Sequence, residues 1–538
     1  MRQIVFIIMA LCLAFFFSCK KADDSTPPPV PAALTASPAT LTFKGYAGGI
    51  DSFTVTYDGK WSVSIVSSNA SWLKLSSDNG SGNKKIYVTV EQANTSGTDK
   101  TATIEVKPEG ATTQKATITV TQQFFNFTAS HRVYGGTETD EFNKAIPATD
   151  GGYIAVGTTK STGGDISKNH GIRDVWVVKT NADGTKLWEK TYGGAGDDFG
   201  YSIVSSPDGG YLIAGTTGST DGDVTGNHGQ FDVWLIKIDG NGTIAWQKTY
   251  GGSRLEDAWS LIATTDGGYL VAAVANSSDG DVSGYHNPSS PSTIYLSDTW
   301  LLKVDANGVI VWQKCYGSTD EELGIAVTES PDGYAVIGHT DAKQANGDIT
   351  TAYGGYDVWL FKVNKAGVMQ WQKSLGGTKN DVGRIIENTN DGGYIIGTNT
   401  VSPELGYRVG ASDAWIVKLD GTGNKIWEKT LGGKYYDDPI AIIATVAGDY
   451  IVGGSSSSPD GDLTGNIGGM DGWIFKLSNS GTLEWQKNCG GTEYDQINSM
   501  VYLGNNNYLV AGRSSSNDHD ITGQHGQGDA WLMTFNAQ

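Results

Sequence analysis

The sequence predicts an all-β protein in which a small N-terminal Ig-like β-sandwich precedes a seven-bladed β-propeller of four-stranded blades. The first observation is a repeat. Asp-x-Trp occurs seven times, and Tyr-Gly-Gly or a close variant recurs at steps of 56 to 66 residues. A fixed period of this size indicates a repeat architecture. The second observation is that no stretch has the length and 3.6-residue period of an amphipathic helix. The third is a segment before the repeats that has short alternating runs but lacks the period.

Residues 1–18 predict a signal peptide. Arg2 supplies a positive start, and Ile4 to Phe17 is an apolar run shorter than the roughly 20 residues that span a bilayer. Cys19 follows Ser18, and this junction resembles a lipoprotein cleavage and lipidation site. The resemblance implies that Cys19 carries a lipid anchor in place of a transmembrane helix. The alternative is a plain secretory signal with an incidental cysteine.

Residues 19–33 predict an extended stalk. The run Lys20-Lys21-Ala22-Asp23-Asp24 resembles the tag that directs Bacteroidetes lipoproteins to the outer face of the outer membrane. Four prolines between residues 27 and 31 then favour a stiff spacer. The resemblance implies a lipid-anchored protein of the outer membrane that is exposed at the cell surface.

Residues 34–122 predict the β-sandwich, because short alternating runs are separated by Gly, Asn and Ser turns. The predicted strands are residues 52–57, 61–65, 85–90, 101–106 and 115–121. The segments Trp61-Ser-Val-Ser, Ser71-Trp72-Leu73, Asn79-Gly-Ser-Gly82, Val88-Thr-Val90, Thr101-Ala-Thr-Ile and Thr117 to Gln122 resemble the BACON domain. That family is named for a proposed carbohydrate-binding role and is often N-terminal in Bacteroidetes lipoproteins. Trp61 and Trp72 are either a sugar-stacking platform or core residues of a spacer domain.

Residues 125–538 predict the propeller. In the second unit, the predicted strands are residues 202–205, 211–216, 233–238 and 244–250, and the tight turns contain Asp-Gly and Gly-Gly. An unmatched strand, Phe127 to Tyr134, precedes the first unit and can complete the last blade, which removes the open edges. The marks Asp-Gly-Gly-Tyr, Asp-x-Trp and Trp-Gln-Lys-x-Tyr-Gly-Gly resemble bacterial β-propeller repeats of secreted and surface proteins. This resemblance implies the fold and no single chemistry.

Residues that recur in every blade predict structure, because a single active site must break the symmetry. The Asp-x-Trp tryptophans and the fourth-strand tryptophans suit packing within and between blades. Cys315 and Cys489 lie in fourth strands three units apart, so we expect no disulfide between them.

Acidic residues recur in two loops of each unit that emerge on the same face of a propeller. One acid lies six positions after the start of each Tyr-Gly-Gly mark, and a Gly-Asp pair lies in the second-to-third-strand loop of six units. Either each acid caps its own turn by accepting backbone N–H bonds, or the loops bind Ca²⁺ through oxygen ligands. The Ca²⁺ alternative names Asp221, Asp223, Asn227 and Asp232, although their spacing does not fit an EF-hand loop.

Departures from the repeat are the better guide to a ligand site. Trp259 stands where other units have Tyr201 or Gly324, and the third unit has an enlarged second-to-third-strand loop. Aromatic side chains mixed with acids and amides suit a polar, sugar-like ligand; ordinary drift of loop sequences is the alternative. The candidate ligand-binding residues are Trp259, Tyr285, His286, Tyr295, Tyr353, Tyr407 and Arg408.

The leading functional hypothesis is non-catalytic binding of a glycan or another extracellular ligand. The first alternative is a protein-interaction scaffold of the cell envelope, since propellers often present their rims to proteins. A glycan-active hydrolase comes third, because the sequence has no zinc-protease, Cys-x-x-Cys, phosphate-loop or nucleophile-elbow motif. The net charge of −20 argues against a nucleic-acid partner. We expect a monomer.

Overall fold

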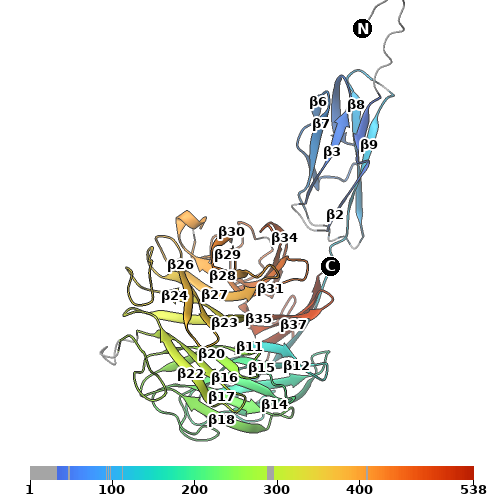
Figure 1. Ribbon diagram of the computed structural model, residues 1–538. Helices are drawn as coiled ribbons and strands as arrows, with labels where there is room; N and C mark the ends of the chain where they lie inside the picture. The colour runs from blue at the N-terminus through green and yellow to red at the C-terminus, as the bar shows by residue number, and fades with distance from the viewer. Residues whose placement is uncertain are drawn as a thin grey trace, which may run out of the picture.

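The computed structural model describes residues 33–538 apart from residues 46–48, 93, 95, 97, 112, 288–295, 408–409, 464 and 538. The predicted signal peptide, Cys19, Tyr295 and Arg408 therefore lie outside the described residues. The chain forms two bodies, and the small N-terminal domain stands at one side of the propeller (Figure 1). Among the described residues, no helix is long and apolar enough to cross a bilayer.

The small domain is a sandwich of two sheets. Their strand orders are β1-β3-β7-β5 and β2-β9-β8-β4-β6. Both Trp61 and Trp72 are at most 3% exposed and belong to the core between the sheets. The structure therefore supports the core alternative for these two residues rather than the sugar platform. The strands are β1 (Thr35–Ser37), β2 (Thr40–Phe43), β3 (Ile50–Thr56), β4 (Lys60–Ile65), β5 (Leu73–Leu75), β6 (Asn79–Ser81), β7 (Lys84–Val90), β8 (Lys100–Pro108) and β9 (Ala116–Gln122).

The propeller consists of seven four-stranded antiparallel sheets, which confirms the predicted fold class. The first strands of successive blades contact one another around the ring, so they are the inner strands that face the axis. From the axis outward, blades 1 to 6 are β11 (Asp140–Pro147), β12 (Tyr153–Thr159), β13 (Asp174–Thr180), β14 (Lys186–Tyr192); β15 (Asp198–Ser205), β16 (Tyr211–Thr217), β17 (Asp232–Ile238), β18 (Ile244–Tyr250); β19 (Glu256–Ala263), β20 (Tyr269–Ala275), β21 (Asp298–Val304), β22 (Ile310–Tyr316); β23 (Glu322–Ser330), β24 (Gly333–Thr340), β25 (Asp357–Asn364), β26 (Met369–Leu375); β27 (Asp381–Asn388), β28 (Tyr394–Thr400), β29 (Asp413–Leu419), β30 (Lys425–Leu431); and β31 (Asp437–Ala444), β32 (Tyr450–Ser456), β33 (Asp471–Leu477), β34 (Leu483–Cys489). A short 3₁₀ turn, η1 (Pro403–Leu405), lies in a loop of blade 5.

Blade 7 combines strands from both ends of the propeller sequence. Its first three strands are β35 (Asp495–Gly504), β36 (Asn507–Ser514) and β37 (Asp529–Ala537), and its fourth strand is β10 (Phe127–Tyr134). All eight residues of β10 pair with β37 in an antiparallel register. His131 on β10 also stacks on Trp531 of β37 with ring centroids 5.8 Å apart. The predicted closure by an N-terminal strand is therefore confirmed.

Each inner strand carries a β-bulge at the same place, and β35 has a second register shift between Tyr502 and Gly504. The bulge inserts an unpaired residue between the third and fifth residues of the strand, for example Tyr201 between Gly200 and Ser202. A bulge re-aims the side chain that it inserts. The seven inserted residues are Asn143, Tyr201, Trp259, Ile325, Arg384, Ile440 and Asn498. Trp259 is thus equivalent to Ile325 in blade 4, which corrects the predicted equivalence with Gly324.

Candidate functional site

The recurring loop acids hold the blades together. Asp140 is fully buried at the start of β11 and accepts hydrogen bonds from the Gly136 N–H, at 2.8 Å, and from the Thr159 and Ser161 hydroxyls, at 2.5 and 2.8 Å. The equivalent acids of the other six blades are also fully buried, and they accept backbone N–H bonds in the same way. The structure therefore supports the capping alternative for this set, which is Asp140, Asp198, Glu256, Glu322, Asp381, Asp437 and Asp495.

A second buried acid, from the Asp-x-Trp mark, lies beside each loop acid. A Cβ atom added to Gly193 would lie 2.6 Å from both Asp174 Oδ1 and Asp198 Oδ2. Asp174 Oδ1 is buried and has no hydrogen-bond partner. Burial raises the pKa of both carboxyls. Glycine follows the Tyr of the mark because two carboxylate oxygens fill the space that a side chain would need.

The predicted Ca²⁺ ligands all have protein partners. Asp221 accepts the Ala195 N–H at 2.7 Å, and Asp223 accepts the Gly193 N–H at 3.3 Å. The Asn227 amide donates to two backbone carbonyls. Asp232 is buried and accepts the His228 N–H at 2.9 Å. In the described part of the chain, no three His, Cys, Asp or Glu side chains form a group that could hold a metal ion. Ca²⁺ binding stays a prediction.

Most of the candidate ligand residues in the loops have structural contacts. Tyr285 is 7% exposed, and its hydroxyl donates to the Leu296 carbonyl at 2.5 Å. His286 Nδ1 lies 2.6 Å from Asp298 Oδ2, which repeats a contact that three other blades make. Tyr353 is half exposed, and the Tyr407 hydroxyl donates to the Gly410 carbonyl at 2.5 Å.

Trp259 has a different setting, at the bulge of the inner strand of blade 3. It is 39% exposed, and its ring lies 5.8 Å from that of Tyr201, the bulge residue of blade 2, at an angle of 18°. Phe199 stacks on the other side of this pair, 6.1 Å from Tyr201. The other five bulge residues are not aromatic. The propeller thus has one aromatic row beside its axis.

Two carboxyls accompany this row. Asp257 precedes Trp259 by two residues and accepts the Thr216 hydroxyl at 2.5 Å. Burial raises the pKa of Asp257 to about 6, and it also raises the pKa of Glu141 on β11. Burial is the largest cause of the raised pKa of Tyr201, and the charges of Asp257 and Glu141 add to it, so each of the two carboxyls acts on Tyr201. We define Phe199, Tyr201, Trp259, Glu141 and Asp257 as the axis cluster.

A charged pair lies further along the axis. Lys144 of blade 1 donates to the Ser202 hydroxyl at 3.1 Å. Glu387 belongs to blade 5, which is not next to blade 1 in the ring, yet the two charges influence each other. Burial lowers the pKa of Lys144 to about 8 and raises that of Glu387 to about 7. Sequence analysis missed this pair, although each residue is a charged exception among apolar or small equivalents in the other blades.

Comparison with known proteins identifies the small domain. A family model described as the viral BACON domain matches residues 33–123. This match supports the predicted BACON resemblance and describes the N-terminal domain alone. The regulatory protein FlaEY of Caulobacter vibrioides is 24% identical over 374 residues. The matched region covers 63% of this chain and 39% of FlaEY, so this chain spans well under half of that protein.

Solved structures resemble the chain at low sequence identity. The match to the Neurospora crassa Pan2 WD40 domain has 11% sequence identity and a TM-score of 0.42. It covers 76% of this chain and 95% of the Pan2 chain. The match to hydrazine synthase of Kuenenia stuttgartiensis has 10% sequence identity and a TM-score of 0.44. It covers 70% of this chain and 93% of the hydrazine synthase chain. A Bacteroides ovatus GH5 xyloglucanase in complex with a heptasaccharide is 23% identical over 22% of this chain and 30% of its own, with a TM-score of 0.16.

Proposed function

We propose that this protein binds glycans without catalysis and that the axis cluster is the binding site. The observation that carries the proposal is the stacked and accessible Trp259–Tyr201 pair, which breaks the sevenfold symmetry of the inner strands. An aromatic face suits the apolar C–H face of a sugar ring. The Asp257 and Glu141 carboxyls supply acceptors for hydroxyl groups at the edge of such a ring. The BACON match of the N-terminal domain supports a role in carbohydrate binding.

The same arrangement supports binding better than hydrolysis. The acids Asp198, Glu256 and Glu322 are fully buried and bonded to hydroxyl or backbone groups, so they are not free to act on a substrate. A glycosidase needs a pair of carboxyls on either side of the scissile bond. The carboxyls of the axis cluster instead flank an aromatic row, which suits recognition.

Binding to immobilised and soluble glycans tests this proposal. We expect Trp259→Ala in the full chain to weaken glycan binding by about tenfold or more, because a stacking aromatic ring is lost. Tyr87→Ala is the matched control, since Tyr87 is also about half exposed but lies on the small domain. Each titration is made with Ca²⁺ and with EDTA. If no glycan binds, or if Trp259→Ala binds as tightly as the parent protein, the proposal is wrong.

We also propose that Cys19 anchors the protein in the outer membrane, with the propeller exposed at the cell surface. The signal sequence, the Ser18-Cys19 junction and the acidic tag after it support this location. The proline-rich stalk would hold the two domains away from the membrane. A surface location is compatible with glycan ligands and also with an envelope protein as partner.

A further inference from the structure

The contact between blades 6 and 7 differs from the other contacts in the ring. In five contacts, the fourth-strand tryptophan of one blade is covered by a glycine from the turn between the third and fourth strands of the next blade. A Cβ atom on Gly481, for example, would come within 2.9 Å of the Trp427 ring. The other pairs are Trp188 with Gly242, Trp246 with Gly308, Trp312 with Gly367 and Trp371 with Gly423.

Trp485 has no such cover. Its neighbour is blade 7, whose fourth strand is β10 from the other end of the propeller sequence, so no turn joins its third and fourth strands. Phe125, just before β10, packs on the Trp485 ring with centroids 5.4 Å apart. In two other contacts the indole N–H donates to the covering turn, from Trp312 to the Lys365 carbonyl and from Trp427 to the Asn479 carbonyl, each at 3.0 Å. Trp485 is 7% exposed, and its indole N–H has no such turn to donate to.

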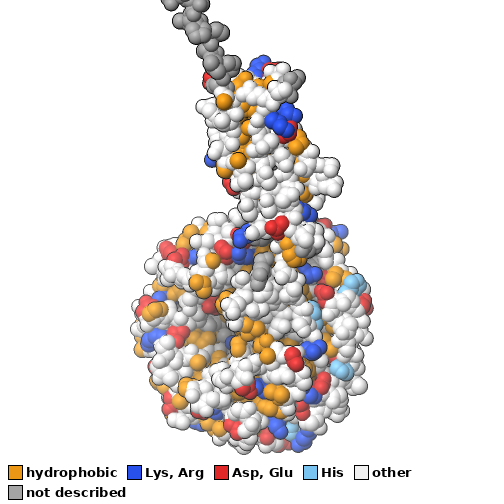
Figure 2. Space-filling model, turned by 90° about the vertical axis from the view of Figure 1, so that its right-hand side faces the viewer, with side chains coloured by type: hydrophobic (Ala, Val, Ile, Leu, Met, Phe, Trp, Pro, Cys, Tyr) orange, Lys and Arg blue, Asp and Glu red, His pale blue; other side chains and the backbone are white. Residues whose placement is uncertain are grey.

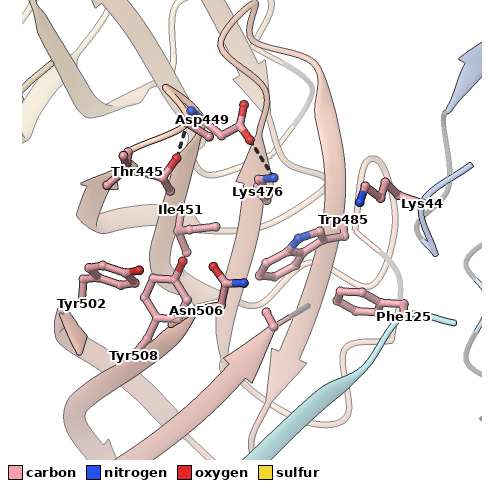
Figure 3. Close-up of a pocket in the computed structure, with 13 residues that line it drawn as sticks. Lys44, Phe125, Thr445, Asp449, Ile451, Lys476, Trp485, Tyr502, Asn506 and Tyr508 are labelled. Atoms are coloured by element: carbon pink, nitrogen blue, oxygen red, sulfur yellow. Dashed lines mark hydrogen bonds and ion pairs between the residues drawn. The ribbon is translucent and has the colours of Figure 1, made fainter. Parts of the chain in front are cut away.

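The space left by the missing turn is a pocket of about 490 Å³ between the small domain and the propeller. Figure 3 shows the Trp485 indole on one wall and Tyr502 and Tyr508 on another, with Lys44 reaching in from the small domain. Tyr502 is 43% exposed and stacks at an angle on Tyr508, with centroids 5.4 Å apart. The pocket therefore offers an accessible aromatic face.

The polar groups of this pocket are mainly donors. Asp449 and Glu484 both pair with Lys476, at 2.8 Å each, so the carboxylate and the ammonium group that line this pocket are already engaged within the protein. Lys44 has no ion pair among the described residues, and the Asn506 amide group also points into the pocket in Figure 3. A ligand that satisfies these groups must bring acceptors and a negative charge.

We infer that this pocket binds an acidic saccharide, with the sugar ring against Tyr502, an oxygen acceptor on the Trp485 N–H and the carboxylate on Lys44. The inference extends the proposed glycan binding to a second site of defined charge. It makes the small domain a part of the site, because Lys44 belongs to that domain. The pocket volume suits a short saccharide of two or three rings rather than a long chain segment.

Calorimetric titration of the full chain with trigalacturonate and with its methyl ester tests the inference, because the two probes differ in charge and share the sugar rings. We expect the acid to bind and the ester to bind about tenfold more weakly or not at all. Trp485→Phe keeps a packed aromatic ring and removes the N–H, so it should weaken binding of the acid by about tenfold. Lys44→Gln should do the same, and added salt should reduce the affinity of the parent protein.

Trp427→Phe is the matched control, since the Trp427 N–H already donates to Asn479 and faces no pocket of this kind. It should leave the affinity unchanged, and thermal unfolding should show that all variants fold. Equal binding of the acid and the ester, no binding of either, or full affinity of Trp485→Phe would overturn the inference. Trp259→Ala should leave trigalacturonate binding here intact, so failure of this site and failure of the axis cluster are distinguishable.

Discussion

Paired buried carboxyls define the repeat at the level of single residues. Asp471 and Asp495 show the arrangement at the start of blade 7. A Cβ atom on Gly490 would lie 2.7 Å from an oxygen of each, and Asp471 Oδ1 has no hydrogen-bond partner. Burial raises the pKa of Asp471 to about 6. Burial disfavours the charge of Asp471 and the nearby charge of Asp495 adds to this effect, so the folded protein favours a proton on Asp471.

Stability should therefore fall as the pH rises from about 4 to 7. In the unfolded chain these acids titrate near 4, whereas in the folded protein the pKa is about 6 for Asp471, for its equivalent Asp357 and for the loop acid Asp437. The folded state thus binds more protons over this range, and its free energy of unfolding decreases as those protons are lost. Thermal unfolding at a series of pH values measures this slope.

Asp471→Asn separates this effect from other titrations. Asparagine resembles the protonated acid and can donate to Asp495, so the variant should melt several degrees higher than the parent at pH 8 and show a smaller dependence on pH. Below about pH 4 a different group of acids acts in the opposite direction. Hydrogen bonds from Thr389 and Lys418 hold the pKa of Asp391 at about 2, and the stability that this contributes is lost only in strong acid. An Asp471→Asn variant that melts lower than the parent at every pH would contradict protonation of Asp471 in the folded protein.

Closure is decided at the level of one element, β10. This strand supplies eight residue pairs to β37 and covers the edge that would otherwise be open. Its pattern of exposure also differs from that of the inner strands, because the fourth strand lies at the rim of the ring and seven of its eight residues are exposed or partly buried. The tryptophan of the last Asp-x-Trp mark depends on β10, since Trp531 stacks on His131.

Removal of β10 should open the ring. We expect a chain that begins at residue 135 to unfold at least about 10 °C below one that begins at residue 124 and to aggregate through the free edge of β37. Size-exclusion chromatography and thermal unfolding compare the two. The longer chain keeps Phe125 and all of β10, so it controls for loss of the small domain. Equal melting temperatures would show that the strand is dispensable.

At the level of the whole molecule, charged side chains of both signs are mixed over the surface. The space-filling view shows acidic and basic side chains interspersed over the face that is turned to the viewer, with the narrower small domain beside the propeller (Figure 2). Such a surface has no strong field of one sign on that face. The two proposed sites, the axis cluster and the pocket between the domains, therefore depend on local groups rather than on a one-sided charge.

The membrane anchor is tested at the same scale. In a Gram-negative host, Cys19→Ala should move the protein from the membrane fraction to the soluble fraction, because the lipid is attached to that thiol. Protease added to intact cells should degrade the parent protein if the propeller faces outward. A membrane-bound Cys19→Ala protein would exclude lipid on this residue as the anchor, and a protected parent protein would exclude the surface location.

The sequence by itself determined the repeat, the blade number, the closing strand and the sandwich, because each depends on local patterns of alternation and turn residues. It missed the short strands β1, β2, β5 and β6, which are too brief to show a period. For the functional residues it found Trp259, since that residue departs from the repeat. It placed Tyr285 and His286 among ligand residues although both make structural contacts.

Only the tertiary structure decided which unusual residues meet. Trp259 and Tyr201 are 58 positions apart and stack because the same bulge recurs in neighbouring blades. Lys44 and Trp485 line one pocket because β10 closes the ring and leaves a turn missing at that contact. A repeat pattern describes what every blade shares. A site forms where the ring closes, or where two residues that depart from the repeat become neighbours in space. Those contacts depend on distances in space that a one-dimensional period does not contain.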